Sequence, residues 1–282
     1  MKVAFVCDTG TGLSPAQLET YGVYGAPLQI TFDEKTYLEN VEINVDEVYA
    51  EMMKGKMIKT SLANMEETEA LFTHLKNEGY EMIFAVPICS GLSGTINMMR
   101  LTAETVGLKF DYYDCHCTAI LEHYLCVRAK QLYEEGKTLD EIKVILDQTT
   151  NSANTLIIPD DLMHLARGGR LTPATAKLAG LLKIKPILKI DASSEGKIDV
   201  HEKIRTIGKA MDKVVADLKE KGVDETYKIC IAHSNGIENA ELMKRKLLLI
   251  FPNHDIEIVP LVSVISVHVG LDCIGVQAFK KF

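Results

Sequence analysis

The stretch Ile83–Thr95, IFAVPICSGLSGT, passes from an apolar run into a loop of glycine and hydroxyl residues and then opens an amphipathic helix. The apolar part predicts a strand that is buried on both faces of a sheet. The loop's glycines allow tight turns and close approach of the backbone to a ligand. The helix start near Gly94 supplies unpaired N–H groups and the positive end of a helix dipole, beside the hydroxyls of Ser90, Ser93 and Thr95. This combination predicts a binding site for an anionic or carbonyl oxygen.

Composition limits the class of protein. The chain has 282 residues, of which 47% are hydrophobic, enough for two modest domains or one large one. No apolar run approaches the roughly 18 residues of a membrane span, and the first residues lack a signal peptide, so we expect a cytoplasmic protein. A net charge of −8 argues against a nucleic-acid partner, because such partners need a basic surface.

The seven cysteines do not form a recognisable metal motif. Most of them lie in or beside apolar runs, where a cytosolic thiol is usually a small buried hydrophobe. Cys115-His116-Cys117 brings together three residues of types that bind zinc. It lacks the C-x₂-C spacing and a second ligand pair, so zinc is the less favoured interpretation and we expect no metal site.

In the first half of the chain, strand-like runs alternate with helical periodicity, which predicts a mostly parallel sheet flanked by helices. The predicted strands are Val3–Cys7, Leu28–Phe32, Ile83–Ile88 and Phe110–Asp114. The predicted helices are Asp46–Lys54, Glu66–Glu78, Gly94–Val106, Thr118–Glu135 and Thr138–Gln148, the last with a Thr138-x-x-Glu141 capping box.

The polar segment 149–154, TTNSAN, predicts a boundary between two α/β domains, residues 1–152 and 153–282. For the second domain we expect a mixed sheet with helices on its faces. Its predicted strands are Thr155–Ile158, Pro186–Ile190, Lys197–Glu202, Tyr227–His233, Ile256–Pro260, Val264–His268 and Ile274–Phe279. Its long predicted helices are Thr206–Lys221 and Glu238–Phe251.

A second hydroxyl pair, Thr60-Ser61, precedes a helix that Asn64 could cap. Ordinary turn and capping chemistry explains this pattern without a ligand. The same pair could also belong to the oxygen-binding site predicted for the Ser93 loop. Both interpretations stay open.

The segment Arg167–Lys189 contains two arginines, four lysines and no acid, in a chain that is otherwise acidic. Within it, Pro173–Leu182 predicts a short helix, with the proline in its first turn. One interpretation is a solvated face over core leucines. The other is a mobile lid that contacts an anionic membrane surface or an acidic partner.

His268 and His233 each end a predicted strand, where a histidine is more often a hydrogen-bonding group than a catalyst. A serine esterase with Ser93 as nucleophile and His268 as base is nevertheless an alternative. The nucleophile elbow of such enzymes requires G-x-S-x-G, and here Thr95 occupies the last glycine position. No acid stands out as a third member. A sugar- or phosphate-binding module at the same helix start is a further alternative.

Taken together, these features resemble the DegV family of bacterial fatty-acid-binding proteins, which includes the binding subunits of fatty acid kinase. The resemblance spans the whole chain, and the glycine-hydroxyl loop together with the RGGR segment is specific. The segments that carry it are Asp8-Thr9, Lys59-Thr60-Ser61, Ser90–Thr95, Asp114, Leu165–Arg170, Lys185-Pro186-Ile187, Arg205 and Val264–Gly270. The chain departs from the family pattern at Leu62-Ala63-Asn64 and at Val269–Asp272.

The resemblance implies two α/β domains with a long-chain fatty acid between them, its acyl chain in an apolar tunnel of the second domain. The residues implied to bind the carboxylate are Thr60, Ser61, Ser93, Gly94, Arg170 and His268. It also implies a non-catalytic carrier, with no cofactor other than the fatty acid. A kinase catalytic subunit would be the partner, contacted through Arg167, Arg170 and Arg205.

Overall fold

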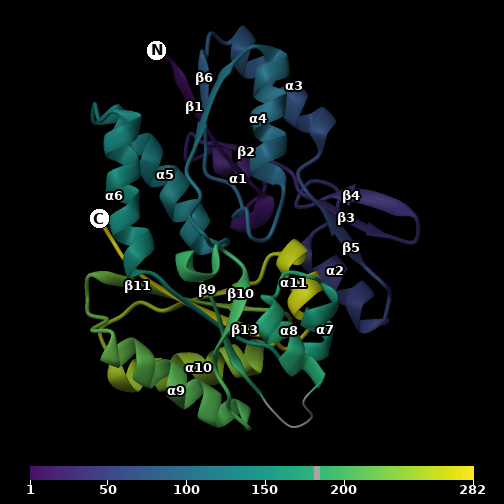
Figure 1. Ribbon diagram of the computed structural model, residues 1–282, viewed down its shortest axis with the longest axis vertical. Helices are drawn as coiled ribbons and strands as arrows, with labels where there is room; N and C mark the ends of the chain where they lie inside the picture. Colours follow the sequence, from purple (N-terminus) through teal and green to yellow (C-terminus); the bar gives the residue numbers. More distant parts are fainter. Residues whose placement is uncertain (181–184) are drawn as a thin grey trace. The chain divides into compact units, whose positions relative to one another are not determined.

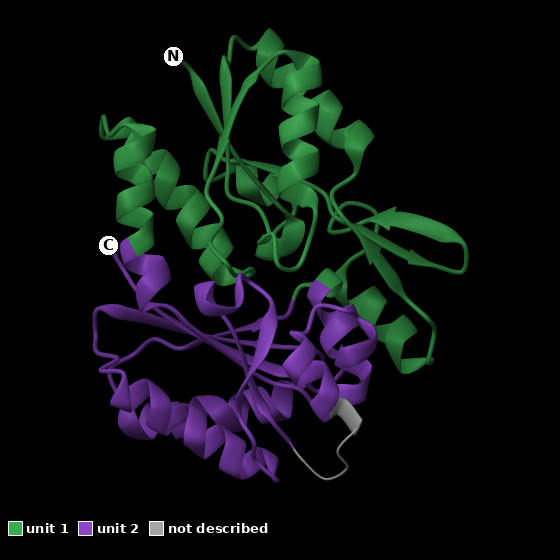
Figure 2. Ribbon diagram, viewed as in Figure 1, with its two compact units in different colours: residues 1–147, 262–264 green, residues 148–261, 265–282 purple. Residues whose placement is uncertain are grey.

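The computed structural model describes residues 1–180 and 185–282 and divides into two compact units (Figure 2). Unit 1 comprises residues 1–147 and 262–264, and unit 2 comprises residues 148–261 and 265–282. Both units are α/β, as the strand and helix patterns predict. Among the described residues, no helix is both long and apolar enough to cross a bilayer.

Unit 1 is built on a parallel sheet with the strand order β2-β1-β6-β7 (Figure 1). Its strands are β1 (Val3–Asp8), β2 (Tyr24–Ala26), β6 (Met82–Ala85) and β7 (Lys109–Tyr112). Every residue of β1 and β6 is buried, because helices cover both faces of these central strands. The strand predicted to reach Ile88 ends at Ala85; beyond it only the Val86 N–H still donates to the carbonyl of Val6, at 2.8 Å.

The helices of unit 1 follow the predicted ranges to within a few residues, except α1, which was not predicted. They are α1 (Pro15–Glu19), α2 (Val45–Met53), α3 (Met65–Asn77), α4 (Thr95–Val106), α5 (Ile120–Glu134) and α6 (Leu139–Ser152), with a 3₁₀ turn η1 (Thr9–Thr11) after β1. Asn64 caps α3 by accepting from the Glu67 N–H at 3.0 Å, and the Thr138–Glu141 capping box is confirmed.

The segment 149–154, predicted as a polar boundary, is not a linker loop. Residues 149–152 complete α6, and β8 (Asn154–Ile158) starts two residues later. Its hydroxyls are used in packing: Thr149 Oγ1 donates to the carbonyl of Lys280, and Ser152 Oγ accepts from the Lys280 N–H. Polar composition therefore reflects side-chain hydrogen bonding here rather than exposure to solvent.

A small antiparallel sheet in unit 1 has the order β4-β3-β5. Its strands are β3 (Gln29–Phe32), β4 (Lys35–Leu38) and β5 (Lys59–Ser61). Thr60 pairs with Ile30 and Ser61 pairs with Gln29, so the second hydroxyl pair of the sequence lies on an edge strand. Asn64 follows three residues later, and its N–H donates to the carbonyl of Pro27.

Unit 2 is built on a six-stranded mixed sheet with the order β10-β9-β8-β13-β11-β12 (Figure 1). The strands besides β8 are β9 (Ile187–Ile190), β10 (Ile198–Glu202), β11 (Tyr227–His233), β12 (Glu257–Pro260) and β13 (Ile274–Lys280). Two long helices, α9 (Ile207–Glu220) and α10 (Ile237–Ile250), pack against each other and the sheet. Their apolar faces and the central strands form the core of this unit.

The basic segment of unit 2 begins with two short helices, α7 (Leu162–Arg167) and α8 (Pro173–Ala176), followed by the 3₁₀ turn η2 (Lys177–Gly180). Asp199 in β10 accepts from the hydroxyls of Thr172 and Thr175, at 2.6 and 2.9 Å. The helix predicted over Pro173–Leu182 is therefore shorter than expected in its described part. Leu181 and Leu182, like residues 183 and 184, lie outside the described residues, and a second 3₁₀ turn, η3 (Ala192–Ser194), follows β9.

The prediction of a strand over Val264–His268 is wrong, because these residues form helix α11 (Ser263–Val269). Valine and isoleucine favour strands locally, since their branched side chains are restricted in a helix. Here the chain buries Val264 and Val267, three residues apart on one helical face, and Gly270 ends the helix with φ of +81°. His268 is thus a helical residue, while His233 ends β11 as predicted.

Candidate functional site

In unit 1, Thr95 joins the loop before α4 to the segment after β5. Its hydroxyl lies 2.9 Å from Ser93 Oγ and accepts from the Ala63 N–H at 3.3 Å. Ser93 Oγ also accepts from the Thr95 N–H at 3.3 Å. One side-chain hydrogen bond, from the Ala63 N–H to Thr95 Oγ1, therefore links two segments that are 32 positions apart in the sequence. Thr60 and Ser93 are half-buried, and Ser61 is exposed.

At the start of α4, the helix lies where the sequence predicts it, but its glycines do not have the predicted role. Gly94 occupies the N-cap position without a side-chain capping bond, so the first N–H groups of the 12-residue helix have no cap of this kind. Its φ is −83°, and Gly91 is not among the residues with positive φ. The glycines are therefore not required by backbone conformation. Gly94 is exposed, and a Cβ placed on it would lie 3.6 Å from Cδ2 of Leu62.

Ser90 has a structural role within unit 1. Its hydroxyl and N–H both donate to Asp114 Oδ2, at 2.5 and 3.2 Å, and the other oxygen of Asp114 accepts from the His116 N–H at 2.9 Å. Asp114 thereby ties the loop after β6 to the loop after β7. The hydroxyl of Ser90 is therefore used in holding these two loops together.

In unit 2, the RGGR segment packs against His268. A Cβ placed on Gly168 would lie 2.7 Å from Nδ1 of His268, so no larger residue fits while the imidazole stays where it is. Gly169 has φ of +71°, a conformation that favours glycine. Arg170 Nη1 donates to the carbonyl of Gly168 at 2.6 Å, which folds the guanidinium back over this turn. Glycine is therefore needed at position 168 because His268 lies close to it, and it is favoured at position 169 because the backbone has a positive φ.

Burial, followed by the nearby charges of Arg170 and His164, lowers the pKa of His268 to about 4. The imidazole is therefore neutral near pH 7, and it can donate one hydrogen bond while accepting another. A neutral imidazole beside a guanidinium suits the binding of a carboxylate, which then meets one full positive charge. It does not suit general-base catalysis at neutral pH as well as an unshifted histidine would.

Ser93 does not have the setting of an esterase nucleophile. Its hydroxyl hydrogen-bonds to Thr95, not to a histidine, in the contacts of the described residues. Thr95 also stands where the nucleophile elbow requires glycine. The sequence therefore lacks the turn that an esterase nucleophile requires at Ser93.

The sequence analysis assigned no binding or catalytic role to three buried carboxyl groups of unit 1, on Asp8, Glu39 and Glu122. Asp8 Oδ1 accepts from the Gly10 N–H at 2.7 Å and Oδ2 from the Ile88 N–H at 3.0 Å. In a sheet of this order, the crevice between β1 and β6 is where doubly wound folds bind ligands. Asp8 uses the N–H groups at this position, so the protein supplies its own anion there.

Burial raises the pKa of all three carboxyl groups. The pKa of Asp8 rises to about 6 and that of Glu39 to about 7, and in both cases hydrogen bonds partly offset the desolvation. For Glu122, burial and the adjacent charge of Asp8 raise the pKa well above its ordinary value. Since like charges disfavour double ionisation, Glu122 keeps its proton and Asp8 ionises first.

The remaining candidate residues lie apart from these clusters. Arg167 ends α7 and Arg205 precedes α9, and both are exposed. The Cys115-His116-Cys117 loop contains buried cysteines, and the described residues include no group of three or more histidine, cysteine or acidic side chains with metal-binding geometry.

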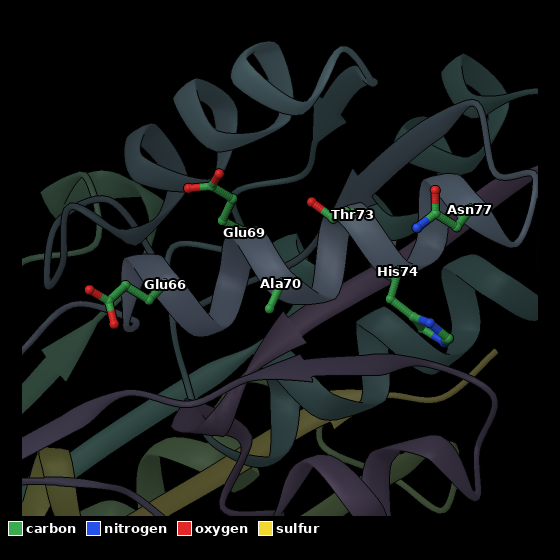
Figure 3. A pocket seen from close by; sticks show the side chains of 6 residues that line it. All are labelled: Glu66, Glu69, Ala70, Thr73, His74 and Asn77. Atoms are coloured by element: carbon green, nitrogen blue, oxygen red, sulfur yellow. The ribbon is translucent and has the colours of Figure 1, made fainter.

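A shallow open hollow runs along one face of α3, lined by Glu66, Glu69, Ala70, Thr73, His74 and Asn77, and contains none of the predicted binding residues (Figure 3).

The comparisons with known proteins decide the family. The sequence profile described as "Uncharacterised protein, DegV family" matches residues 2–281. The chain belongs to the DegV family. A DegV domain-containing protein of Streptococcus pyogenes serotype M3 is 31% identical over 272 residues, covering 96% of each chain.

Solved DegV structures share the fold over the full chain. A fatty acid binding DegV family protein of Streptococcus agalactiae superposes with a TM-score of 0.89 at 31% identity, covering 100% of both chains. DegV of Bacillus subtilis, described as a fatty acid binding protein, superposes with a TM-score of 0.86 at 28% identity, again over 100% of both chains.

We expect Gly168→Ala to displace the imidazole of His268. The added methyl group would need the space of Nδ1, and overpacking of this kind costs about 1–3 kcal/mol. Histidine ring signals in ¹⁵N NMR spectra report the displacement, and urea unfolding reports the stability. Gly208→Ala, in α9 with no atom within 4 Å of the new Cβ, is the control and should be neutral or slightly stabilising. Unchanged His268 signals in Gly168→Ala would contradict the packing described here.

We expect the stability of the protein to depend on pH through Glu39. Its pKa is raised to about 7, so the folded state keeps a proton that the unfolded chain loses above about pH 4.5. The contribution of Glu39 to the free energy of unfolding is thus present at low pH and is lost as the pH rises toward 7. Relative to Glu39→Gln, which cannot ionise, the wild type should lose up to about 1.4 kcal/mol per pH unit between pH 5 and 7. A constant difference in unfolding free energy across this range would show that Glu39 titrates normally.

Proposed function

We propose that this protein binds one long-chain fatty acid and presents its carboxylate to a separate kinase that forms an acyl phosphate. The observation that supports the proposal is the hydrogen bond between Ala63 and Thr95, which joins the segment after β5 to the start of α4, in a chain of the DegV family. The solved relatives at 31% and 28% identity are described as fatty acid binding proteins.

The ligand groups proposed for the carboxylate are neutral except for one. Thr60, Ser61, Ser93 and the N–H groups after Gly94 would contribute hydrogen bonds from unit 1. His268, neutral near pH 7, and Arg170 would contribute from unit 2. Hydrogen bonds to a charged oxygen are worth about 1.5–3 kcal/mol each. These hydrogen bonds would hold the carboxylate in place with Arg170 as the one positively charged group beside it.

Affinity in this proposal comes mainly from the acyl chain. Removing a CH₂ group from water contributes about 0.8 kcal/mol, so a long chain can bind tightly with few polar contacts. The chain would run into the apolar interior of unit 2. The polar groups would then decide orientation, with the carboxylate left where a phosphoryl donor can reach it.

The kinase partner accounts for the exposed arginines. Arg167 and Arg205 would contact the partner, and Arg170 would stabilise charge at the carboxylate during phosphoryl transfer. The basic segment from Arg167 to Lys189 would make transient contact with an anionic membrane surface during loading.

We expect Thr60→Ala combined with Ser93→Ala to weaken fatty acid binding by about 100–10,000-fold while the fold is retained, because two hydrogen bonds to a carboxylate are lost. Native mass spectrometry of the purified protein, titrated with oleate, measures occupancy. The matched control is Thr31→Ala with Thr36→Ala, which removes a hydroxyl pair from the same small sheet, 2.9 Å apart.

Wild-type protein that is empty after purification and fails to take up oleate would contradict the proposal. Titration with phosphorylated sugars in parallel separates a phosphate-binding module from a fatty acid carrier. Reaction of Ser93 with a phosphonate probe would instead support the esterase alternative.

We expect Arg170→Ala to reduce partner-dependent phosphorylation more than fatty acid binding. The guanidinium would act on charge that develops at the carboxylate, whereas the acyl chain provides most of the affinity. Acyl phosphate formation with a fatty acid kinase subunit, measured beside oleate occupancy, separates the two effects. Arg245→Ala, an exposed arginine on α10, is the control. Loss of binding with intact phosphorylation of the remaining complex would show that the roles are reversed.

A further inference from the structure

Helix α11 carries His268 but is too short to be stable alone. It has seven residues, about two turns, and isolated helices of this length do not persist in water. Its sequence, Ser263–Val269, also favours a strand locally because it is rich in β-branched residues. Something outside the helix must therefore hold it, and side chains from two other elements contact its backbone.

The first contact is at the N-terminal turn. The Val264 N–H donates to Oε1 of Glu39 at 2.9 Å. Glu39 follows β4 and is completely buried, and its second oxygen accepts from the Thr9 hydroxyl at 2.7 Å. Thr9 Oγ1 in turn accepts from the Leu28 N–H at 3.0 Å. The acceptor for the helix start is thus fixed by its own partners and cannot easily turn away.

The second contact is at the C-terminal turn. The Nε2 atom of His164, on α7, lies 2.8 Å from the carbonyl oxygen of Val267, where its N–H tautomer donates. The same imidazole packs against Gly270, since a Cβ placed there would lie 3.3 Å from the His164 ring. The last carbonyls of a helix have no partner within it, and His164 supplies one.

We propose that Glu39 and His164 are positioning residues for His268: by holding the N–H of Val264 and the carbonyl of Val267, they set the imidazole's orientation toward a bound carboxylate. The proposal rests on the proposed function, since it assigns these residues to the same binding site. Val264 is one helical turn before His268, and Val267 is adjacent to it, so a shift at either end moves the ring. Gly168 then provides the surface against which the ring is placed.

The contact between Glu39 and the Val264 N–H depends on one chemical group and not on side-chain volume alone. Glu39 must supply an acceptor oxygen, and its charge is not essential to that contact. Glutamine keeps a carbonyl oxygen of the same reach, whereas alanine leaves the Val264 N–H unpaired in a buried setting. Glu39→Gln should therefore rescue the position of His268, and Glu39→Ala should not.

The experiment compares Glu39→Ala, Glu39→Gln and His164→Ala in the full-length protein. The first readout is the ¹⁵N spectrum of the His268 imidazole between pH 5.5 and 7.5, assigned with His268→Gln. The second is the oleate dissociation constant. Glu42→Ala is one control, because Glu42 also accepts a backbone N–H, that of Leu38 at 2.8 Å. His254→Ala is the other, because His254 Nε2 lies 3.0 Å from the carbonyl oxygen of Asp224.

The expected result is a neutral His268 ring in the wild type, the controls and Glu39→Gln. In both alanine variants, the ring should gain water, titrate within this range and lose its wild-type shifts, with oleate binding weakened about tenfold. Unchanged His268 signals in folded Glu39→Ala and His164→Ala would overturn the proposal, whatever happens to oleate binding. If the wild type does not bind oleate, the proposed function fails, and the ring signals still decide whether these residues position His268.

Discussion

The carboxylate of Asp8 accepts hydrogen bonds from the backbone of two loops at once, Gly10 after β1 and Ile88 after β6. These loops leave the two central strands of the parallel sheet at the edge where such folds bind their ligands. An internal carboxylate therefore satisfies these N–H groups, and the loops after β1 and β6 are held to each other through it.

Asp8 and Glu39 are buried carboxyl groups that accept hydrogen bonds from backbone N–H groups. Glu122 keeps its proton next to Asp8, and Glu39 holds the Thr9 hydroxyl on one side and the first turn of α11 on the other. Burial makes ionisation of these groups costly, and each hydrogen bond to the charged form returns part of that cost. The same groups therefore connect sites of the chain that are as much as 225 residues apart.

Local patterns predicted the α/β architecture well. Buried strands such as β1 and β11 and amphipathic helices such as α3 and α9 agree with the predicted ranges to within one residue. The caps of Asn64 and Thr138 were also readable, because capping depends on residues only three positions apart. The SGLSGT loop and the RGGR segment indicated the family, which the comparisons confirmed. The roles predicted for all the site residues stay predictions: Thr60, Ser61, Ser93, Gly94, Arg167, Arg170, Arg205 and His268.

The sequence by itself determined the strand and helix order, the family, and the residue types that could meet a carboxylate, because each depends on local periodicity or short motifs. Only the tertiary structure decided that Val264–His268 is helical, since a buried acceptor from Glu39 and a donor from His164 outweigh the strand preference of its valines. Only the tertiary structure explained Gly168, whose missing side chain makes room for an imidazole a hundred residues later. Contacts between residues so far apart in the sequence leave no periodic signal in it, yet they determine where the side chain of His268 lies.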